Sequence, residues 1–490
     1  MPPISSFERA TPQSQGVDPS GIADFVRAAN DRGHGLHSLM VVRHGKVVAE
    51  GWWEPYSASQ EHMMFSVSKT FTATAIGIAQ DEGLVSVDDP ILSYFPSYAT
   101  PEVRENVRDV KVRDLLAMAT GHDVDTMEIM RAQPTEDWVK VFLDTPIVFP
   151  PGKSFLYNSG ASFVLSALIS SRTGKSVLEY LTPRLFEPLG MRVPPWAANR
   201  RGIPYGASGL RITTEDVAKI GQLYLQKGMW NGRQLLSEDW VAEASARQVS
   251  NGTDPNDDWA TGYGFQIWRS RHNSFRFDGR YGQFSFVLPE QDAVVAITSG
   301  ARDSRGTTST LWEFMLPAFH DAPLDDDSSA RGRLVELLGS QSVPIFDFLP
   351  TVREPIGSLA GRTFALPFNT LHATSVRLDW EDDVTRLSVS TSDGHAESVD
   401  AGRLEWLPGR TGLWPYEEME SAETLSRAGA VDDSTFEVVQ QLIETPFRRT
   451  WHFQVDHDGE LTVTVGLDNG FWVERTEVLR ATPHNEQEPQ

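Results

Sequence analysis

The sequence contains no cysteine. Disulfide bonds, thiolate metal sites and cysteine nucleophiles are therefore excluded, although this absence says little about the compartment. No run of 18 apolar residues occurs, and residues 1–8 lack a basic segment followed by an apolar one. We therefore expect neither a membrane span nor a signal peptide, and we predict a cytoplasmic protein.

Sequence motifs of several enzyme classes are also missing. The chain has no G-x-S-x-G elbow of an α/β-hydrolase, no H-E-x-x-H helix of a zinc protease and no phosphate-binding Gly-Lys loop. Basic residues are few, with 43 Lys and Arg against 67 Asp and Glu and a net charge of -24. This balance argues against nucleic acid and anionic membranes as partners. We expect a solvated acidic surface and a small-molecule partner, with the oligomeric state open.

The most informative segment that is present is Ser66-Val67-Ser68-Lys69, which precedes an apolar helical run at residues 71–79. Serine and lysine at positions i and i+3 share one face of a helix, so the lysine amine can take the serine proton. The positive end of the helix favours developing negative charge and lowers the pKa of a partly buried lysine. The segment therefore predicts a nucleophile with its base, a capped and solvated helix start being the alternative.

Two later segments have the matching order and setting. Tyr157-Asn158-Ser159-Gly160 precedes a helical stretch that ends near Gly174, and residues 277–283 open a pair of strands at 284–288 and 293–298. With these three motifs the chain resembles the serine β-lactamase and penicillin-binding-protein superfamily. The resemblance is greatest to its class C β-lactamase-like branch of esterases, amidases and D-aminopeptidases.

The resemblance extends over roughly residues 10–320. It includes a hairpin at 39–48, a helix at 112–121, a strand-turn-helix at 207–219 and a core strand at 262–268. It implies an α+β fold, in which a β-lactamase-like antiparallel sheet is flanked by helices and accompanied by an all-helical subdomain.

The length of 490 residues exceeds one compact core, so two domains are expected. We predict a serine hydrolase domain at 1–322, a linker at 323–357, a C-terminal domain at 358–482 and a disordered tail at 483–490.

The C-terminal domain has the short alternating apolar pattern of antiparallel strands, clearest in the hairpin at 451–455 and 461–465. We predict a small β-barrel or sandwich, and several members of the superfamily carry a lipocalin-like barrel there. Residues 407–415 are turn-rich and predict a surface loop, with a loop that narrows the active site as the alternative.

The resemblance implies a role for each matching residue. Ser66 would attack the carbonyl and become acylated, with Lys69 as its base. Tyr157 would pass the proton to the leaving group and then activate water, and we expect Lys69 to lower its ordinary pKa of about 10. Ser159 occupies a position where the family often has Asn, so it would hydrogen-bond Lys69 or the substrate. The backbone N–H groups of Ser66 and Arg280 would stabilise the oxyanion.

The third motif departs from the family. Gly279 aligns with the glycine of K-T-G or H-x-G, which leaves Phe277 where the family has Lys or His. A cation there helps to bind a substrate carboxylate, and phenylalanine cannot, so a neutral ester or amide is favoured over a β-lactam. The predicted substrate-binding residues are Ser159, Phe277, Gly279 and Arg280. Two alternatives stay open: Arg280 or Arg276 replaces the missing cation, or Phe277 is a core aromatic.

The predicted function is a serine hydrolase acting on an ester or amide. The alternatives are an acyltransferase that uses the same acyl-enzyme, and a β-lactamase or penicillin-binding or sensing protein. His62 has no orienting acid that would make a Ser-His triad. The loop containing His122, Asp123 and Asp125 is interpreted as solvated, so no metal and no cofactor are predicted.

Overall fold

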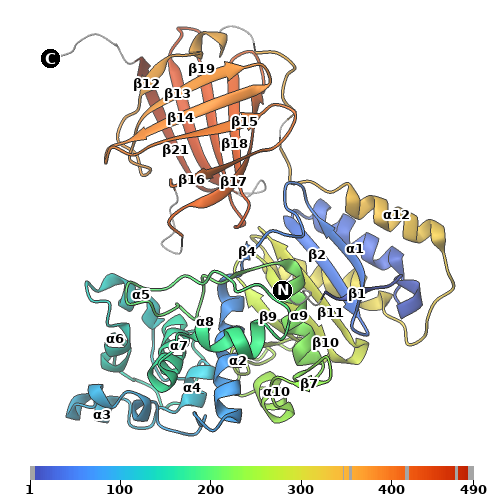
Figure 1. The fold of residues 1–490 in the computed structure, drawn as a ribbon, viewed down its shortest axis with the longest axis vertical. Coiled ribbons are helices and arrows are strands. Elements are labelled where there is room, and N and C mark those ends of the chain that lie inside the picture. Colours follow the sequence, from blue (N-terminus) through green and yellow to red (C-terminus); the bar gives the residue numbers. More distant parts are fainter. Residues whose placement is uncertain (1–5, 346, 353–355, 414–418, 469–472, 484–490) are drawn as a thin grey trace. The chain divides into compact units, whose positions relative to one another are not determined.

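The computed structural model describes residues 6–345, 347–352, 356–413, 419–468 and 473–483 (Figure 1). The chain divides into two compact units, Met1–Gly51 with Glu61–Ser340 and Trp52–Gln60 with Gln341–Gln490. The predicted linker at 323–357 contains helix α12 (Ser328–Gly339), which packs against α1 (Pro19–Asp31) of the first unit. This helix therefore belongs to the first unit.

A seven-stranded sheet forms the centre of the first unit, in the order β1-β3-β2-β11-β10-β9-β8. Its strands are β1 (Glu8–Arg9), β2 (Leu36–Arg43), β3 (Lys46–Trp52), β8 (Trp268–Arg269), β9 (Phe275–Gly279), β10 (Gln283–Leu288) and β11 (Ala293–Ser299). The strands predicted at 39–48 and 284–298 are confirmed. Strands β2, β10 and β11 are buried along their whole length, so both of their faces are covered.

Helix α9 (Thr214–Leu225) packs against β2, β10 and β11. The approach is close at Gly221, where an added Cβ would lie 2.3 Å from Oγ of Ser285 and 2.7 Å from a methyl group of Val294. A larger residue at this position would push the helix off the sheet, so glycine sets the distance between these two layers.

The helical part of the first unit packs around α7 (Ser159–Thr173), which contacts α2, α4, α5, α6 and α8 (Figure 1). The helices are α2 (Ser68–Asp81), α3 (Pro101–Asn106), α4 (Val112–Leu116), α5 (Thr126–Ala132), α6 (Trp138–Asp144) and α8 (Val177–Leu181). The remaining elements are α10 (Glu238–Ser245), α11 (Ser304–Thr310), β4 (His62–Met63), β5 (Arg211–Ile212), β6 (Met229–Trp230) and β7 (Arg233–Gln234). Asn158 caps α7 at its start, and Gly174 ends it with a φ of 69°, as predicted.

The second unit is a barrel whose strands follow the order β15-β14-β13-β12-β21-β20-β19-β18-β17 in antiparallel pairs, closed by a parallel pairing of β15 with β17 at Gly402 and Arg427. The strands are β12 (Thr363–Ala365), β13 (Ala373–Glu381), β14 (Val384–Thr391), β15 (Ala396–Gly402), β16 (Leu407–Thr411), β17 (Ala422–Ala430), β18 (Thr435–Leu442), β19 (Arg448–Val455), β20 (Leu461–Asp468) and β21 (Val473–Pro483). Its core includes Trp451, Phe436 and Val463. The predicted barrel is confirmed, and its lipocalin-like character stays a prediction.

The expectation of a loop at 407–415 is wrong for its first half. Leu407–Thr411 forms strand β16, which pairs with β17 at the end of the strand order. Pro408 is tolerated because a strand at the end of the order can lack a backbone donor on its open edge. Residues 414 and 415 and most of the predicted tail, 484–490, lie outside the described residues.

The segment Trp52–Gln60 joins the second unit although it precedes Ser66 by only a few residues. Tyr56 is buried there, donating its hydroxyl proton to the carbonyl of Thr445 at 2.7 Å and accepting from Nε2 of Gln441 at 2.8 Å. The aromatic residues of this segment therefore contribute to packing in the second unit.

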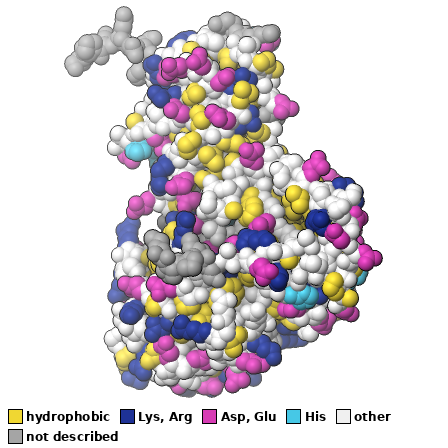
Figure 2. Space-filling model, turned by 45° about the vertical axis from the view of Figure 1, so that its right-hand side comes forward, with side chains coloured by type: hydrophobic (Ala, Val, Ile, Leu, Met, Phe, Trp, Pro, Cys, Tyr) yellow, Lys and Arg dark blue, Asp and Glu magenta, His cyan; other side chains and the backbone are white. Residues whose placement is uncertain are grey.

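Acidic side chains are spread among basic ones over the face seen in Figure 2, in agreement with the predicted solvated surface. Among the described residues, no helix combines the length and the apolarity that a membrane crossing requires.

Candidate active site

Ser66 lies in a 3₁₀ turn, η2 (Phe65–Val67), that leads directly into α2. Phe65 has a φ of 46°, in the left-handed region that bulky residues rarely adopt. Its ring packs edge to face against that of Tyr281, with centroids 5.2 Å apart, and Tyr281 itself has a φ of 65°. Two residues with an uncommon backbone conformation therefore hold the Ser66 turn beside the turn that follows β9.

Lys69 lies one turn further along α2 and is buried. Its Nζ is 3.0 Å from Oγ of Ser66 and 3.0 Å from the carbonyl oxygen of Ala207. Burial lowers the pKa of Lys69 to about 7, against a weaker opposing effect of the Asp125 carboxylate. A large share of Lys69 is therefore neutral at neutral pH, as a general base must be.

The two partners of Lys69 determine the direction of proton transfer. The Ala207 carbonyl can only accept a hydrogen bond, so a neutral Lys69 donates an N–H to it. The amine lone pair then remains for the hydroxyl proton of Ser66. Sequence reasoning missed Ala207, because a backbone carbonyl leaves no side-chain signal.

Tyr157 directly precedes Asn158, the N-cap residue of α7. Its phenol hydrogen-bonds the side chain of Ser66. Nζ of Lys69 lies 4.8 Å from the centroid of the Tyr157 ring. The structure therefore brings together the three side chains that the sequence identified as catalytic.

The pKa of Tyr157 lies above its ordinary value. Burial raises this pKa most, the charges of Asp278 and Asp125 raise it further, and only the hydrogen bond to Ser66 acts in the opposite direction. The expectation that Lys69 lowers the pKa of Tyr157 is wrong: this pKa is raised, and Lys69, whose own pKa is about 7, carries only part of a positive charge at neutral pH. Tyr157 is a neutral phenol, suited to relaying a proton.

An aromatic wall holds the Tyr157 ring. Trp268 stacks on it with centroids 5.7 Å apart and planes 25° apart, and Tyr263 meets it edge-on at 6.3 Å. The sequence placed both residues in a core strand and did not identify them as part of the site.

Strand β9 turns alternate side chains to opposite faces. Phe277 is fully buried and packs against Tyr224 of α9, with ring centroids 5.1 Å apart, so the core interpretation of Phe277 describes its position. The next residue, Asp278, points to the other side, where its charge reaches Tyr157. The third motif thus presents a carboxylate, not a phenyl ring, beside the site.

Arg276 does not replace the missing cation. Its side chain is fully buried, and its guanidinium donates to Oδ2 of Asp278 at 2.9 Å and to Oγ of Ser270 at 2.6 Å. The same group lies 4.1 Å from the ring centroid of Trp259. Arg280 is exposed, with its guanidinium 4.7 Å from the ring centroid of Tyr281.

Gly279 brings the end of β9 against the Ser66 turn. An added Cβ at Gly279 would lie 2.3 Å from the carbonyl oxygen of Met64, which is backbone and cannot rotate away. The segments that carry the amides of Ser66 and Arg280 are therefore in contact. This placement agrees with the predicted oxyanion hole, which stays a prediction.

We expect Gly279→Ala to lower kcat by about 100-fold, because the methyl group would separate the two amides by a fraction of an ångström or more. The matched control is Gly332→Ala in α12, where an added Cβ meets nothing within 4 Å. Steady-state kinetics on a p-nitrophenyl ester measure both. A kcat of Gly279→Ala within twofold of the wild type would show that this contact does not set the reaction geometry.

Ser159 is partly exposed at the first position of α7, and the hydrogen bonds described for Lys69 do not include it. Asp125 is a neighbour that the sequence did not identify as part of the site. Its carboxylate accepts N–H bonds from Met127 at 3.0 Å and Ser159 at 2.8 Å, so it ties the start of α5 to the start of α7. Asp125 thereby fixes the backbone next to Tyr157.

The histidines noted in the sequence have structural partners. Nδ1 of His62 lies 3.1 Å from the carbonyl oxygen of Met63 and must donate to it, so its Nε2 accepts from Nδ1 of His37 at 3.1 Å. His122 is buried, with its Nδ1 2.8 Å from Oγ1 of Thr120. Among the described residues, no group of three or more His, Asp or Glu side chains could hold a metal ion.

Acid should destabilise the fold through His62. Burial lowers its folded pKa from 6.5 to about 4, so the unfolded chain binds the proton more tightly and stability falls as the pH drops below 6.5. Between pH 7 and pH 5 this imidazole should remove about 2 kcal/mol of the free energy of unfolding. Urea titrations followed by tryptophan fluorescence should show a shallower pH dependence for His62→Gln. Equal slopes in the two proteins would contradict this origin.

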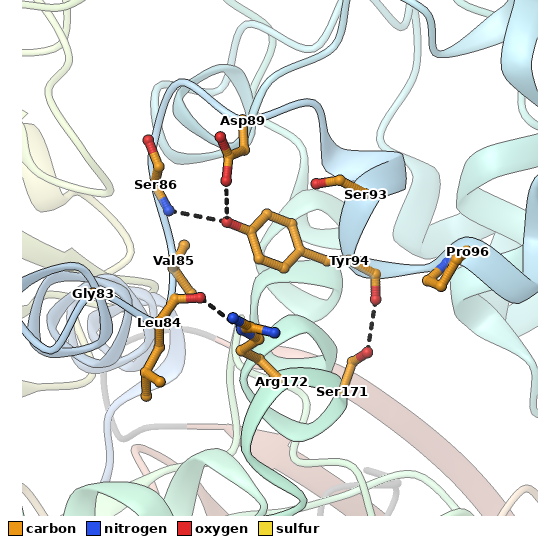
Figure 3. A pocket seen from close by; sticks show the side chains of 10 residues that line it. All are labelled: Gly83, Leu84, Val85, Ser86, Asp89, Ser93, Tyr94, Pro96, Ser171 and Arg172. Atoms are coloured by element: carbon orange, nitrogen blue, oxygen red, sulfur yellow. Dashed lines mark hydrogen bonds between the residues drawn. The ribbon is translucent and has the colours of Figure 1, made fainter.

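Figure 3 shows a pocket of about 600 Å³ between the loop after α2 and the last turn of α7. Both helices begin beside the predicted catalytic side chains, and 14 residues of α2 span about 21 Å, so this pocket lies at the far ends of the two helices. Tyr94 donates to Asp89 at 2.7 Å, and Arg172 donates to the carbonyl of Leu84 at 2.8 Å. Several polar groups that line this pocket therefore bond to one another.

Comparisons with known proteins give a family and distant relatives. A family model described as Beta-lactamase matches residues 22–316, more than half of the chain. A 6-aminohexanoate-dimer hydrolase of Paenarthrobacter ureafaciens is 25% identical over 223 residues, 43% of this chain and 57% of its own length. A D-aminopeptidase of Brucella anthropi is 29% identical over 189 residues, 36% of this chain and 35% of its own. The chain thus spans about half of the first relative and a third of the second.

Among solved structures, a putative 6-aminohexanoate-dimer hydrolase from Bacillus anthracis matches with a TM-score of 0.52 and 21% identity. The match covers 65% of this chain and 88% of that one. At this identity it shows that the two chains share a fold.

Proposed function

Since the chain belongs to the Beta-lactamase family, we propose that it is a serine hydrolase that cleaves an ester or amide bond through an acyl-enzyme on Ser66. One observation carries this proposal. Oγ of Ser66 lies 3.0 Å from Nζ of Lys69, a buried amine whose pKa is about 7, while the phenol of Tyr157 bonds the same hydroxyl group.

The geometry supports a sequence of proton transfers. Lys69 takes the Ser66 proton as Oγ forms a bond to the carbonyl carbon, and the oxyanion is stabilised by the N–H groups of Ser66 and Arg280. As the bond to the leaving group breaks, Tyr157 gives its proton to the leaving atom and regains one from Lys69. In deacylation, the oxygen of a water molecule bonds to the acyl carbon while its proton passes along the same path to Oγ of Ser66, whose bond to the acyl carbon breaks and releases the acid.

The class of substrate is supported by two independent facts. The two relatives named above are a 6-aminohexanoate-dimer hydrolase and a D-aminopeptidase. In this chain, Arg276, which could have bound a β-lactam carboxylate, is fully buried and bonded to Asp278. A carboxylate-bearing β-lactam is therefore less suited to this site than an ester or amide.

A substrate screen with acid-quenched mass spectrometry tests the proposal. The panel contains p-nitrophenyl esters, D-aminoacyl p-nitroanilides and nitrocefin, each with and without an added alcohol as acyl acceptor. We expect turnover of esters or anilides and a transient acyl adduct on the peptide that contains Ser66. Preferential formation of the alcohol ester would identify an acyltransferase. Slow release of a nitrocefin adduct would identify a penicillin-binding protein.

A further inference from the structure

The side chain of Asp278 occupies a defined position at the edge of the active site. On β9 it faces away from Phe277 and shares its face with Arg276, whose guanidinium lies 5.6 Å from the ring centroid of Trp268. Trp268 in turn stacks on Tyr157. This chain of contacts links Asp278 to the aromatic wall of the site.

Asp278, the negative member of the Arg276–Asp278 ion pair, is the member on the side of the active site. Nε of Arg276 lies 2.9 Å from Oδ2 of Asp278, and this contact favours the carboxylate form. The Arg276 side chain is 0% exposed while that of Asp278 is 11% exposed, so Asp278 is the member that reaches the surface. Burial raises the pKa of Asp278 and Arg276 acts against this shift.

Other charges near this point add to the negative character of the interior. Asp125 acts on both Lys69 and Tyr157. Lys69 is neutral when it acts as a base, and the exposed Arg280 lies over the ring of Tyr281, where water screens its charge. Among these groups, the partly buried carboxylates of Asp125 and Asp278 outnumber the buried guanidinium of Arg276, while Arg305 acts on Asp278 from a side chain that is 58% exposed.

The position of Asp278 relative to Tyr157 decides which part of a substrate it meets. Tyr157 is the group that protonates the leaving atom, and Asp278 is close enough to raise its pKa. The ion pair of Asp278 with Arg276, the contact of Arg276 with Trp268 and the stacking of Trp268 on Tyr157 place this carboxylate on the Tyr157 side of the site, where Tyr157 would meet the leaving group.

From this geometry we propose that Asp278 selects substrates whose leaving group carries a positive charge, a protonated or quaternary amine, and disfavours those with a carboxylate there. The inference rests on the proposed hydrolase function and names its substrate class.

The charge preference proposed for Asp278 can be tested with three butyryl thioesters that differ in the charge of the thiol. The thiols are thiocholine, its neutral isostere 3,3-dimethylbutanethiol and 3-mercaptopropionate, and a disulfide reagent measures the thiol released. We expect kcat/KM to fall in the order cationic, neutral, anionic. The ratio of cationic to anionic substrate should drop roughly tenfold or more in Asp278→Asn, since one charge is removed near the leaving group.

Two variants serve as controls. Asp278→Glu keeps the charge and should keep the order of the three substrates. Asp31→Asn removes one negative charge, as Asp278→Asn does, but at the exposed end of α1. It should leave the ratio of cationic to anionic substrate unchanged. A ratio in folded Asp278→Asn within twofold of the wild type would overturn the inference, as would equal rates for the three substrates in the wild type.

A second measurement uses the wild-type protein alone, because removal of the partner of Arg276 can impair folding. Choline, 3,3-dimethylbutanol and 3-hydroxypropionate compete with a neutral ester, and choline should inhibit most strongly. Equal inhibition by the three would overturn the inference. Hydrolysis of all thioesters without charge preference contradicts only the role of Asp278. Absence of hydrolysis and of any Ser66 adduct contradicts the proposed function itself.

Discussion

Replacing Ser66 with alanine should lower kcat by about 10⁴-fold or more on any ester that the wild-type protein hydrolyses, because the acyl-enzyme can no longer form. The fold should be retained, since alanine is well accommodated at the start of a helix. Steady-state assays at high enzyme concentration measure the residual rate.

Ser68→Ala is the matched control for this result. Ser68 belongs to the same motif, but its Oγ accepts the N–H of Leu210 at 3.2 Å inside the core. Its loss should affect stability and leave most of the activity. Comparable losses of activity in the two variants would show that the motif acts through folding and not through a nucleophile.

Lys69→Ala should lower kcat/KM by about 10³- to 10⁴-fold, the usual contribution of a general base at a nucleophile. In the wild type, protonation of Lys69 should remove activity as the pH falls through its folded value of about 7, by tenfold for each further unit. Rates measured between pH 5 and pH 9 give this profile directly.

Lys69→Arg separates the charge of Lys69 from its role as a base. Arginine keeps a positive charge but stays protonated at every accessible pH, so this variant should be as inactive as Lys69→Ala. A wild-type profile that is flat down to pH 5, or an active arginine variant, would contradict the role of Lys69.

Much of the fold could be predicted because local patterns coincide with the tertiary structure. The apolar run at 71–79 and the glycine at 174 mark two helices, and the alternation at 451–465 marks a hairpin of the barrel. The segment Leu407–Thr411 was missed because its proline and glycine have low strand propensity, which a single pairing with β17 overcomes.

The proximity of Ser66 and Lys69 was predictable for the same reason, since their spacing is a local property of one helix. Asp278 was not identified, although Phe275 and Phe277 alternate with Arg276 and Asp278 in a way that assigns the polar pair to one face. The alignment of Gly279 with the glycine of the third motif singled out Phe277 instead. The raised pKa of Tyr157 depends mainly on burial and further on Asp278 and Asp125, which are distant in sequence, so no local pattern indicates it.

The most direct test of the central claim is labelling with a fluorophosphonate, followed by intact-mass analysis and peptide mapping. A serine activated by a neutral lysine should take up one equivalent on Ser66, faster at pH 8 than at pH 6, because Lys69 is then deprotonated. The adduct should be absent from Ser66→Ala. A single adduct on any other residue, or normal labelling of Ser66→Ala, would contradict the assignment of Ser66 as the nucleophile.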